Sequence, residues 1–275
     1  LFAGSNFLHM TTDGGQSWKT ISPDLTRGLP ETIKSSGGPI TQDNTGVEYY
    51  ATIFAVDESP LQEGLIWVGS DDGLIHLTKD GGATWENVTP KKMPDWMMIN
   101  SIDASSFDSG TAYIAGTRYK LGDFTPYLYV TDDYGKNWKL ITDGIKDEHF
   151  TRVLRSDKVN KNILYAGTET GMYISYDRGN SWNEFQKNLP IVPITDLTIK
   201  DNSLIVATQG RSIWMIDDLT VFHQLTPSTD QMKLYKPKDS FRMGGAGGRK
   251  SLTAGTNLPN GAIIHYFIPN YDKEN

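Results

Sequence analysis

The sequence contains no cysteine, no run of lysine and arginine, and no long hydrophobic stretch. The missing cysteines exclude disulfide bonds and thiolate chemistry. No apolar run approaches the roughly 20 residues that a membrane-spanning helix needs. With 26 basic against 33 acidic residues, the net charge of −7 argues against a nucleic-acid-binding surface. We therefore expect no nucleic-acid partner and no membrane span.

Glycine and aromatic residues are plentiful, whereas hydrophobic residues are sparse. The 275 residues include 27 glycines, 13 tyrosines and 7 tryptophans, and 37% of the chain is hydrophobic. Tyrosine and tryptophan favour strands and glycine favours tight turns, so the composition predicts many short strands. A chain of this length is long enough for one large all-β domain.

An eight-residue pattern, [ST]-x-D-x-G-x-x-W, occurs four times without a gap. The copies are residues 11–18 (TTDGGQSW), 78–85 (TKDGGATW), 131–138 (TDDYGKNW) and 175–182 (SYDRGNSW). Successive aspartates of these octets are separated by 67, 53 and 44 residues. The shortest step is about the length of one four-stranded propeller blade, and the longer steps indicate insertions.

Each octet follows a short alternating run, such as residues 74–77 (LIHL), and carries the residues of a turn. Aspartate accepts hydrogen bonds from turn amides, and glycine adopts a positive φ at low cost. Tryptophan offers a large apolar face and one N–H donor, which suits a wedge between neighbouring sheets. We therefore interpret the octets as structural corners whose key residues are Asp13, Trp18, Asp80, Trp85, Asp133, Trp138, Asp177 and Trp182.

The strand patterns divide the chain into successive blades. We predict a partial blade over residues 1–26 that begins with a second strand, and further blades over about 48–90, 99–142, 150–186 and 194–225. In the last blade, residues 221–226 (VFHQLT) are predicted as the fourth strand. Residues 27–47 form a long connection. The predicted domains are a propeller over 1–227, a glycine-rich linker over 228–257 and the truncated first strand of a following β domain, a sandwich, over 258–275. That strand is predicted over residues 260–268 (NGAIIHYFI), with no partner in view. The chain is expected to be a fragment of a larger propeller.

The octets and their flanking motifs resemble the bacterial Asp-box, or bacterial neuraminidase repeat, proteins labelled sortilin-like or glycosyl-hydrolase-like. The matching stretches are residues 36–50 (SGGPITQDNTGVEYY), 58–73 (ESPLQEGLIWVGSDDG), 195–218 (TDLTIKDNSLIVATQGRSIWMIDD) and 259–267 (PNGAIIHYF). The resemblance covers nearly the whole chain and implies an all-β propeller of four-stranded antiparallel blades. It also implies an extracytoplasmic location (periplasmic, secreted or cell-surface) and octets that lie away from the ligand face.

In such a propeller, the loops from fourth to first strands and from second to third strands form the ligand-facing rim. Four rim carboxylates are candidates for the acid pair of a glycoside hydrolase: Asp71, Asp72, Asp123 and Glu169. The alternative is that these acids are ordinary hairpin-turn residues. The five histidines have no metal-ligand spacing, so neither a metal nor a cofactor is expected.

Arginines and aromatic residues at the rim are candidates for ligand binding. A guanidinium can bind a carboxylate or sugar hydroxyls, and exposed rings can stack on sugars or grip a peptide. The candidate ligand-binding residues are Arg118, Arg211, Trp96, Tyr119 and Phe150, with Phe124 and Tyr49 beside them. For Arg211, the alternative interpretation is a surface arginine that packs on Trp214.

These features favour a binding or scaffold module for polysaccharide or peptide over an enzyme. The competing prediction is a xyloglucanase-like glycoside hydrolase that acts on a plant or host glycan through two rim carboxylates. A sialidase is disfavoured because its arginine-isoleucine-proline motif is absent, although Arg118, Arg152 and Arg211 all lie near the predicted rim. A third possibility is a scaffold for the following β domain of the same polypeptide.

Overall fold

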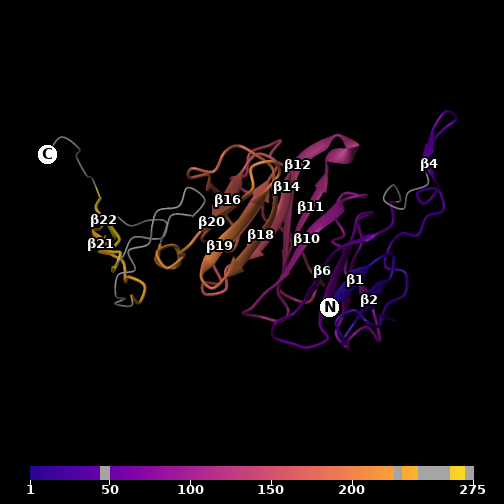
Figure 1. Ribbon diagram of the computed structural model, residues 1–275, viewed down its shortest axis with the longest axis horizontal. Coiled ribbons are helices and arrows are strands. Elements are labelled where there is room, and N and C mark those ends of the chain that lie inside the picture. The colour runs from indigo at the N-terminus through magenta and orange to yellow at the C-terminus, as the bar shows by residue number, and fades with distance from the viewer. Residues whose placement is uncertain (44–49, 226–230, 241–260, 270–275) are drawn as a thin grey trace, which may run out of the picture. The chain divides into compact units, whose positions relative to one another are not determined.

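The computed structural model describes residues 1–43, 50–225, 231–240 and 261–269 (Figure 1). Regular structure in this part of the chain is β-strand apart from two short 3-10 helices, η2 (Tyr119–Leu121) and η3 (Phe222–Gln224). No helix among the described residues has the length and apolarity needed to cross a membrane. The described structure is therefore built from β-sheets.

The sheets follow one another in sequence order, and each uses consecutive strands (Figure 1). The first is three-stranded: β1 (Phe2–Gly4), β2 (Leu8–Met10) and β3 (Lys19–Thr20). The second contains β6 (Ile53–Glu58), β7 (Ile66–Ser70), β8 (Ile75–Thr78) and β9 (Glu86–Asn87). The third contains β10 (Met98–Ala104), β11 (Ala112–Arg118), β12 (Asp123–Thr131) and β13 (Lys139–Leu140).

The fourth sheet contains β14 (Thr151–Ser156), β15 (Leu164–Thr168), β16 (Met172–Ser175) and β17 (Asn183–Glu184). The last of the series is three-stranded: β18 (Ile194–Lys200), β19 (Ser203–Thr208) and β20 (Ile213–Ile216). All pairs in the three four-stranded sheets are antiparallel. These sheets match the predicted blades over 48–90, 99–142 and 150–186.

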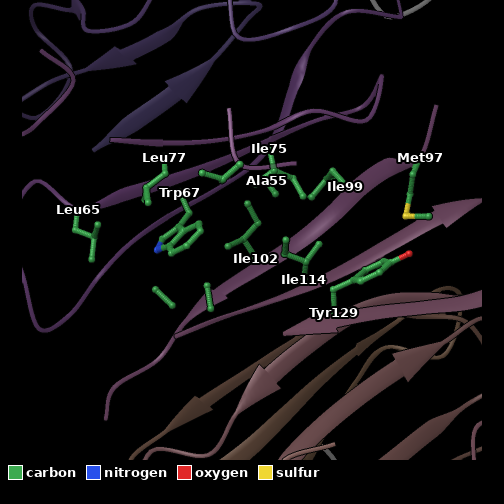
Figure 2. Packing of buried hydrophobic residues seen from close by; sticks show 13 residues of the cluster. Ala55, Leu65, Trp67, Ile75, Leu77, Met97, Ile99, Ile102, Ile114 and Tyr129 are labelled. Atoms are coloured by element: carbon green, nitrogen blue, oxygen red, sulfur yellow. The ribbon is translucent and has the colours of Figure 1, made fainter. Parts of the chain in front are cut away.

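Successive sheets pack face to face, because the first strand of each lies against the first strand of the next. β10 contacts both β6 and β14 in this way. Between the second and third sheets, Trp67, Ile99, Ile102 and Ile114 lie side by side in a buried cluster (Figure 2). The close approach requires Gly69 in β7, because a Cβ there would lie 2.3 Å from Cγ2 of Ile99. An interior of this kind is close-packed and tolerates little added volume.

The four octets share one pattern of hydrogen bonds, which the second octet illustrates. The Thr78 hydroxyl donates to Asp80 Oδ1 at 2.8 Å and accepts the N–H of Gly82 at 2.9 Å. Asp80 also accepts the backbone N–H of Thr84 at 2.9 Å and its hydroxyl at 2.6 Å. The hydrogen bonds from Thr84 and Thr78 lower the pKa of Asp80 to about 2. The octet aspartate is therefore a turn residue in its charged form.

The tryptophan that ends an octet connects its own sheet to the preceding one. Its indole N–H donates to a backbone carbonyl of the preceding segment in three cases: Trp85 to Ile21 at 2.9 Å, Trp138 to Val88 at 2.7 Å and Trp182 to Ile141 at 2.7 Å. Trp182 is the most buried of them, with 4% of its surface exposed. Trp18 is 47% exposed, and its indole N–H has no carbonyl partner among the described residues.

A second connection, which the sequence did not predict, joins the far ends of the first strands. Asp57 in β6 accepts the backbone N–H of Ala104 at the end of β10, at 2.7 Å. Asp103 in β10 accepts the backbone N–H of Ser156 at the end of β14, at 2.9 Å. Each aspartate thus accepts a hydrogen bond from the last amide in the first strand of the following sheet. That amide has no partner within its own sheet.

Replacing Asp57 by asparagine is expected to change how stability depends on pH. Because burial raises the pKa of Asp57 to about 6, the folded state binds this proton more tightly than the unfolded state. The group therefore contributes stability below its unfolded pKa of about 4, and that contribution is lost as the pH rises through the folded pKa. Chemical denaturation should show a fall of up to roughly 3 kcal/mol across this window for the wild type relative to D57N. Parallel pH profiles for the two proteins would contradict this titration.

The described residues divide into two compact units, residues 1–199 with 205–215, and residues 200–204 with those of 216–275. In the second unit, the fourth strand predicted near residues 221–226 is wrong, because residues 222–224 form η3. The unpartnered strand predicted over 260–268 is shorter and has a partner: β22 (Tyr266–Phe267) pairs antiparallel with β21 (Lys233–Leu234). Most of the linker predicted over 228–257 lies outside the described residues, as does Tyr49.

The long connection predicted over residues 27–47 contains a short hairpin within its described part. β4 (Ser36–Gly37) pairs antiparallel with β5 (Gln42–Asp43). Two glycines at its turn region, Gly37 and Gly38, have positive φ values of 82° and 100°. Glycine takes this conformation without the steric penalty of a side chain.

Candidate functional site

The first strands of the three four-stranded sheets share an irregularity at equivalent positions. The register against the second strand shifts between Ile53 and Ala55 in β6, between Ile99 and Ser101 in β10, and between Thr151 and Val153 in β14. One residue of each first strand is thereby left out of the ladder. These residues are Phe54, Asn100 and Arg152, and bulges of this kind commonly redirect a side chain towards a site.

The three redirected residues line a common hollow of about 320 Å³. Arg155, Thr195 and Asp196 also line it, so four successive first strands contribute to its wall. Its volume lies at the lower end of the range for small-molecule sites. The Phe54 ring is 55% exposed. Asn100 Oδ1 is buried without a hydrogen-bond partner in the described structure, so a ligand N–H or O–H would satisfy it.

The charged groups of the hollow are held in ion pairs. Arg152 Nε donates to Glu169 Oε2 at 2.5 Å, and Arg155 Nη2 lies 2.9 Å from Asp196 Oδ1. Arg155 also donates from Nε to the carbonyl oxygen of Leu197 at 2.9 Å. Since each guanidinium faces a carboxylate, the hollow carries little net charge.

Arg152 joins the hollow to a group of aromatic rings at the same end of the sheets. Its guanidinium carbon lies 5.4 Å from the ring centre of Phe150 and 5.8 Å from that of Tyr119. The Tyr119 and Phe150 rings stack with centroids 5.3 Å apart, and Phe124 lies 5.9 Å from Phe150. Phe150 is buried, whereas Phe124 is 47% exposed and presents an apolar face to solvent. The structure thus brings together two of the ligand-binding residues predicted from the sequence, Tyr119 and Phe150.

A second aromatic group surrounds Trp96, another sequence-predicted residue. Its ring stacks on Tyr50 with centroids 5.8 Å apart, and the Arg27 guanidinium carbon lies 4.9 Å above it. Tyr50 donates its hydroxyl to the Trp96 carbonyl oxygen at 3.0 Å. Trp96 has a φ of 61°, which is uncommon for a bulky residue and is found where neighbouring contacts hold it. Arg118 donates from Nε to the carbonyl oxygen of Asp95 at 2.9 Å, beside this group.

Two of the four candidate catalytic carboxylates, Asp71 and Asp72, follow β7 and are buried. Asp71 Oδ1 accepts the backbone N–H of Thr52 at 2.8 Å. Burial, with the nearby charge of Asp72, raises the pKa of Asp71 to about 6. Asp72 accepts the Ser70 hydroxyl at 2.6 Å and the backbone N–H of Arg27 at 2.7 Å. Both aspartates therefore tie the loop after β7 to neighbouring segments.

The other two candidates, Asp123 and Glu169, are paired with arginines. Asp123 Oδ2 lies 2.6 Å from Arg118 Nη1 and accepts the Tyr127 hydroxyl at 2.9 Å. Although burial acts to raise it, the pKa of Asp123 is lowered by hydrogen bonds from Thr125, Tyr127 and Arg118. Glu169 is the partner of Arg152. Each of the four carboxylates thus has an intramolecular partner.

Comparisons with known proteins give the same architecture. The family model described as "Sortilin, neurotensin receptor 3," matches residues 126–242. A GH74 xyloglucanase from Xanthomonas campestris superposes with a TM-score of 0.57 at 16% identity, over 80% of this chain and 34% of that chain. The chain is a β-propeller that resembles the sortilin family over residues 126–242. The prediction of an all-β propeller of this type is confirmed.

Two further solved structures share the propeller fold. An ancestral GH74 enzyme gives a TM-score of 0.51 at 17% identity, over 74% of this chain and 26% of that chain. A component of the COPII outer coat vertex on membranes gives 0.54 at 11% identity, over 76% of this chain and 52% of that chain. Among curated proteins there is no match. The propeller thus spans about half or less of each of these structures, and identities this low establish the fold alone.

The remaining predicted ligand residue, Arg211, lies in the β19–β20 turn of the last propeller sheet. Its Nη1 donates to the Gly210 carbonyl oxygen at 3.0 Å, and Trp214 donates its indole N–H to the Arg211 carbonyl oxygen at 2.8 Å. Arg211 is exposed, and its side chain has no contact with the Trp96 or Phe150 groups among the described residues. These contacts fit the alternative interpretation, a surface arginine beside Trp214.

Sequence reasoning missed several residues that build the propeller site, chiefly Phe54, Asn100 and Tyr50. Phe54 and Asn100 lie at two of the bulges, and Arg152 lies at the third. Aligning the first strands would place all three at one position, after Ile53, Ile99 and Thr151. Within the described residues, no three histidine, aspartate or glutamate side chains gather as a metal site would require.

Proposed function

We propose that the propeller is an extracytoplasmic binding or scaffold module for a polysaccharide or peptide ligand. The observation that carries this proposal is the convergence of Phe54, Asn100 and Arg152 from equivalent bulges on one hollow of about 320 Å³. A ligand there has an exposed ring to stack on, an amide oxygen to satisfy and a guanidinium within reach. The rings of Tyr119 and Phe124 extend this surface beyond Arg152.

The partners of the four carboxylates favour binding over hydrolysis. A glycosidase needs two carboxyl groups that face each other across a substrate, about 5–10 Å apart. Asp71 and Asp72 accept hydrogen bonds from backbone amides, and Asp123 and Glu169 form ion pairs with arginines. The hydrolase retains one favourable observation: the pKa of Asp71 is raised to about 6, as a general acid requires. A reducing-sugar assay on each bound glycan distinguishes the two functions, because a binding module releases no product.

The proposed function is tested by screening the protein on glycan and peptide arrays and measuring affinity by calorimetry. Replacing Phe54 or Tyr119 by alanine is expected to weaken binding about tenfold, because loss of an aromatic stacking surface costs about 1 kcal/mol or more. Leu61, which is 50% exposed in the β6–β7 loop at the opposite end of the sheets, supplies the control substitution. Unchanged affinity in both aromatic variants, or an equal loss in L61A, would contradict the assignment of the site.

Arg211 is tested in the same assay. Its side chain makes only a local hydrogen bond, so R211A is expected to leave the melting temperature nearly unchanged. If Arg211 belongs to the binding surface, the variant weakens binding. If R211A bound with wild-type affinity, Arg211 would not belong to the binding surface.

We also propose that residues 258–275 begin a following β domain of the same polypeptide. Exposed apolar side chains near β22, such as Ile264 (61% exposed) and Tyr266 (65% exposed), support this proposal because further strands would cover them. Cell fractionation of the intact polypeptide tests the location, and limited proteolysis tests the domain. A cytoplasmic protein, or one cleaved throughout residues 258–275, would contradict these two proposals respectively.

A further inference from the structure

A second hollow of about 330 Å³ lies between the third and fourth sheets, at the end that carries the octets. It is lined by Phe107, Asp108, Tyr113, Asp132, Lys161 and Arg178, together with two hydroxyl side chains. β10 runs from the rim to Ala104, and β11 returns from Ala112 to Arg118. A strand of this length spans roughly 20 Å. The octet-side hollow is therefore separate from the site around Phe54.

Arg178 occupies a backbone position where a side chain is costly. Its φ is 62°, and the equivalent residues of the first two octets are Gly14 and Gly81, with φ values of 74° and 70°. A non-glycine residue in this left-handed conformation costs about 1–2 kcal/mol. The guanidinium that this placement provides lies 2.5 Å from Asp132 and also bonds the Tyr113 hydroxyl. Both partners belong to the preceding sheet, so Arg178 is held at the wall of the octet-side hollow.

The remaining polar groups of the octet-side hollow have capacity left for a ligand. Lys161 is exposed and has no ion-pair partner among the residues that the structure describes. Asp108 Oδ1 accepts the Gly110 amide at 2.8 Å, while no described group bonds Oδ2. The Phe107 ring is 42% exposed beside them. The hollow thus offers donors, acceptors and one apolar ring face.

The balance of charge selects the class of ligand. Two carboxylates and two cations line the octet-side hollow, so an anion would meet Asp108 and Asp132, and a cation would meet Lys161 and Arg178. An apolar ligand would remove four charged groups from water without replacing their hydrogen bonds. A neutral molecule with several hydroxyl groups avoids both penalties, because each hydroxyl donates and accepts.

We propose that the octet-side hollow binds one neutral sugar ring. The ring stacks on Phe107, and its hydroxyls donate to Asp108 and accept from Lys161 and Arg178. The volume of about 330 Å³ is that of a small ligand site. This site is independent of the proposed function at the rim, and one ligand chain need not reach both.

The test uses calorimetry and saturation-transfer NMR on the full chain with cellobiose, maltose, lactose and N-acetylglucosamine, and with glucuronic acid as the charged probe. Two variants remove the proposed contacts, F107A and R178G. R178G restores the glycine that the first two octets carry, so its fold and melting temperature are expected to be maintained. The control is L61A, because Leu61 is an exposed apolar residue in the β6–β7 loop and does not line the octet-side hollow.

The expected result is millimolar or tighter binding of at least one neutral probe. F107A and R178G should each weaken it about tenfold or more. L61A and the rim variant F54A should bind like the wild type. Three results would overturn the proposal: no neutral probe binds, glucuronic acid binds more tightly than every neutral probe, or F107A and R178G retain wild-type affinity. A sugar whose binding is lost only in F54A belongs to the rim and would also overturn it.

Discussion

Replacing Trp182 by alanine is expected to destabilise the protein by about 3–5 kcal/mol, the usual cost of truncating a buried aromatic residue. Trp182 is 4% exposed, and its indole donates to the Ile141 carbonyl oxygen at 2.7 Å, so the variant also leaves a buried acceptor without a partner. Urea denaturation followed by circular dichroism measures the free energy of unfolding.

The matched control is W18A, which removes the same side chain at the same position of the first octet. Trp18 is 47% exposed and has no carbonyl partner among the described residues, so the expected loss is about 1 kcal/mol or less. Trp85 is half-buried and bonded to Ile21, so the stability loss of W85A should lie between those of W18A and W182A. Equal losses in W182A and W18A would show that tryptophan contributes within its own sheet and not through the preceding one.

Replacing Gly82 by alanine is the second substitution with a large expected effect, about 2–5 kcal/mol. The φ of Gly82 is 97°, which costs an alanine about 1–2 kcal/mol. In addition, a Cβ at this position would lie 2.3 Å from the Ile21 carbonyl oxygen, and relieving such a clash costs typically 1–3 kcal/mol. The obstructing atom belongs to the backbone of the preceding segment, so the two sheets would have to move apart.

Gly15 separates the two contributions, because its φ is 94° but its Cβ would meet only Trp18, at 3.9 Å. G15A should therefore lose the conformational part alone, about 1–2 kcal/mol. Thermal melts of the two variants give the difference directly. If G82A and G15A had the same melting temperature, the sheets would tolerate added volume at this corner.

The octet corners are the part of the fold that the sequence predicted in most detail. Asp80 bonds groups at most four residues away, so its partners are determined within one octet. The strand patterns likewise gave the three four-stranded sheets, because each hairpin pairs neighbouring segments. The 3-10 helix over residues 222–224 was missed, since the pattern VFHQLT fits a strand equally well when no neighbouring strand is known.

Contacts between sheets could not be predicted from local patterns. The bond from Asp57 to the Ala104 amide joins residues 47 positions apart, and nothing near Asp57 in the sequence marks its partner. The same holds for the stacking of Tyr50 on Trp96. For the candidate site, the strand pattern predicts Tyr119 and Phe150 at the rim, and in the structure their rings stack on each other. The bulges that expose Phe54 and Asn100 were not anticipated, because a one-residue shift in pairing leaves no compositional mark.

Two sets of aspartates have pKa shifts in opposite directions, so acid weakens the contribution of one set to folding and strengthens that of the other. Hydrogen bonds from the residue four positions on lower the pKa of Asp13 and Asp80, so the stability that they contribute above about pH 4 is lost only as the pH falls through their folded values. Burial raises the pKa of Asp57 and Asp71 to about 6, and these groups favour folding at lower pH. Protonation of Asp57 and Asp71 between about pH 6 and pH 4 adds to the stability of the fold, whereas protonation of the octet aspartates below about pH 4 removes stability. Strong acid therefore weakens the repeating corners, where protonation removes the charge that the turn hydrogen bonds stabilise.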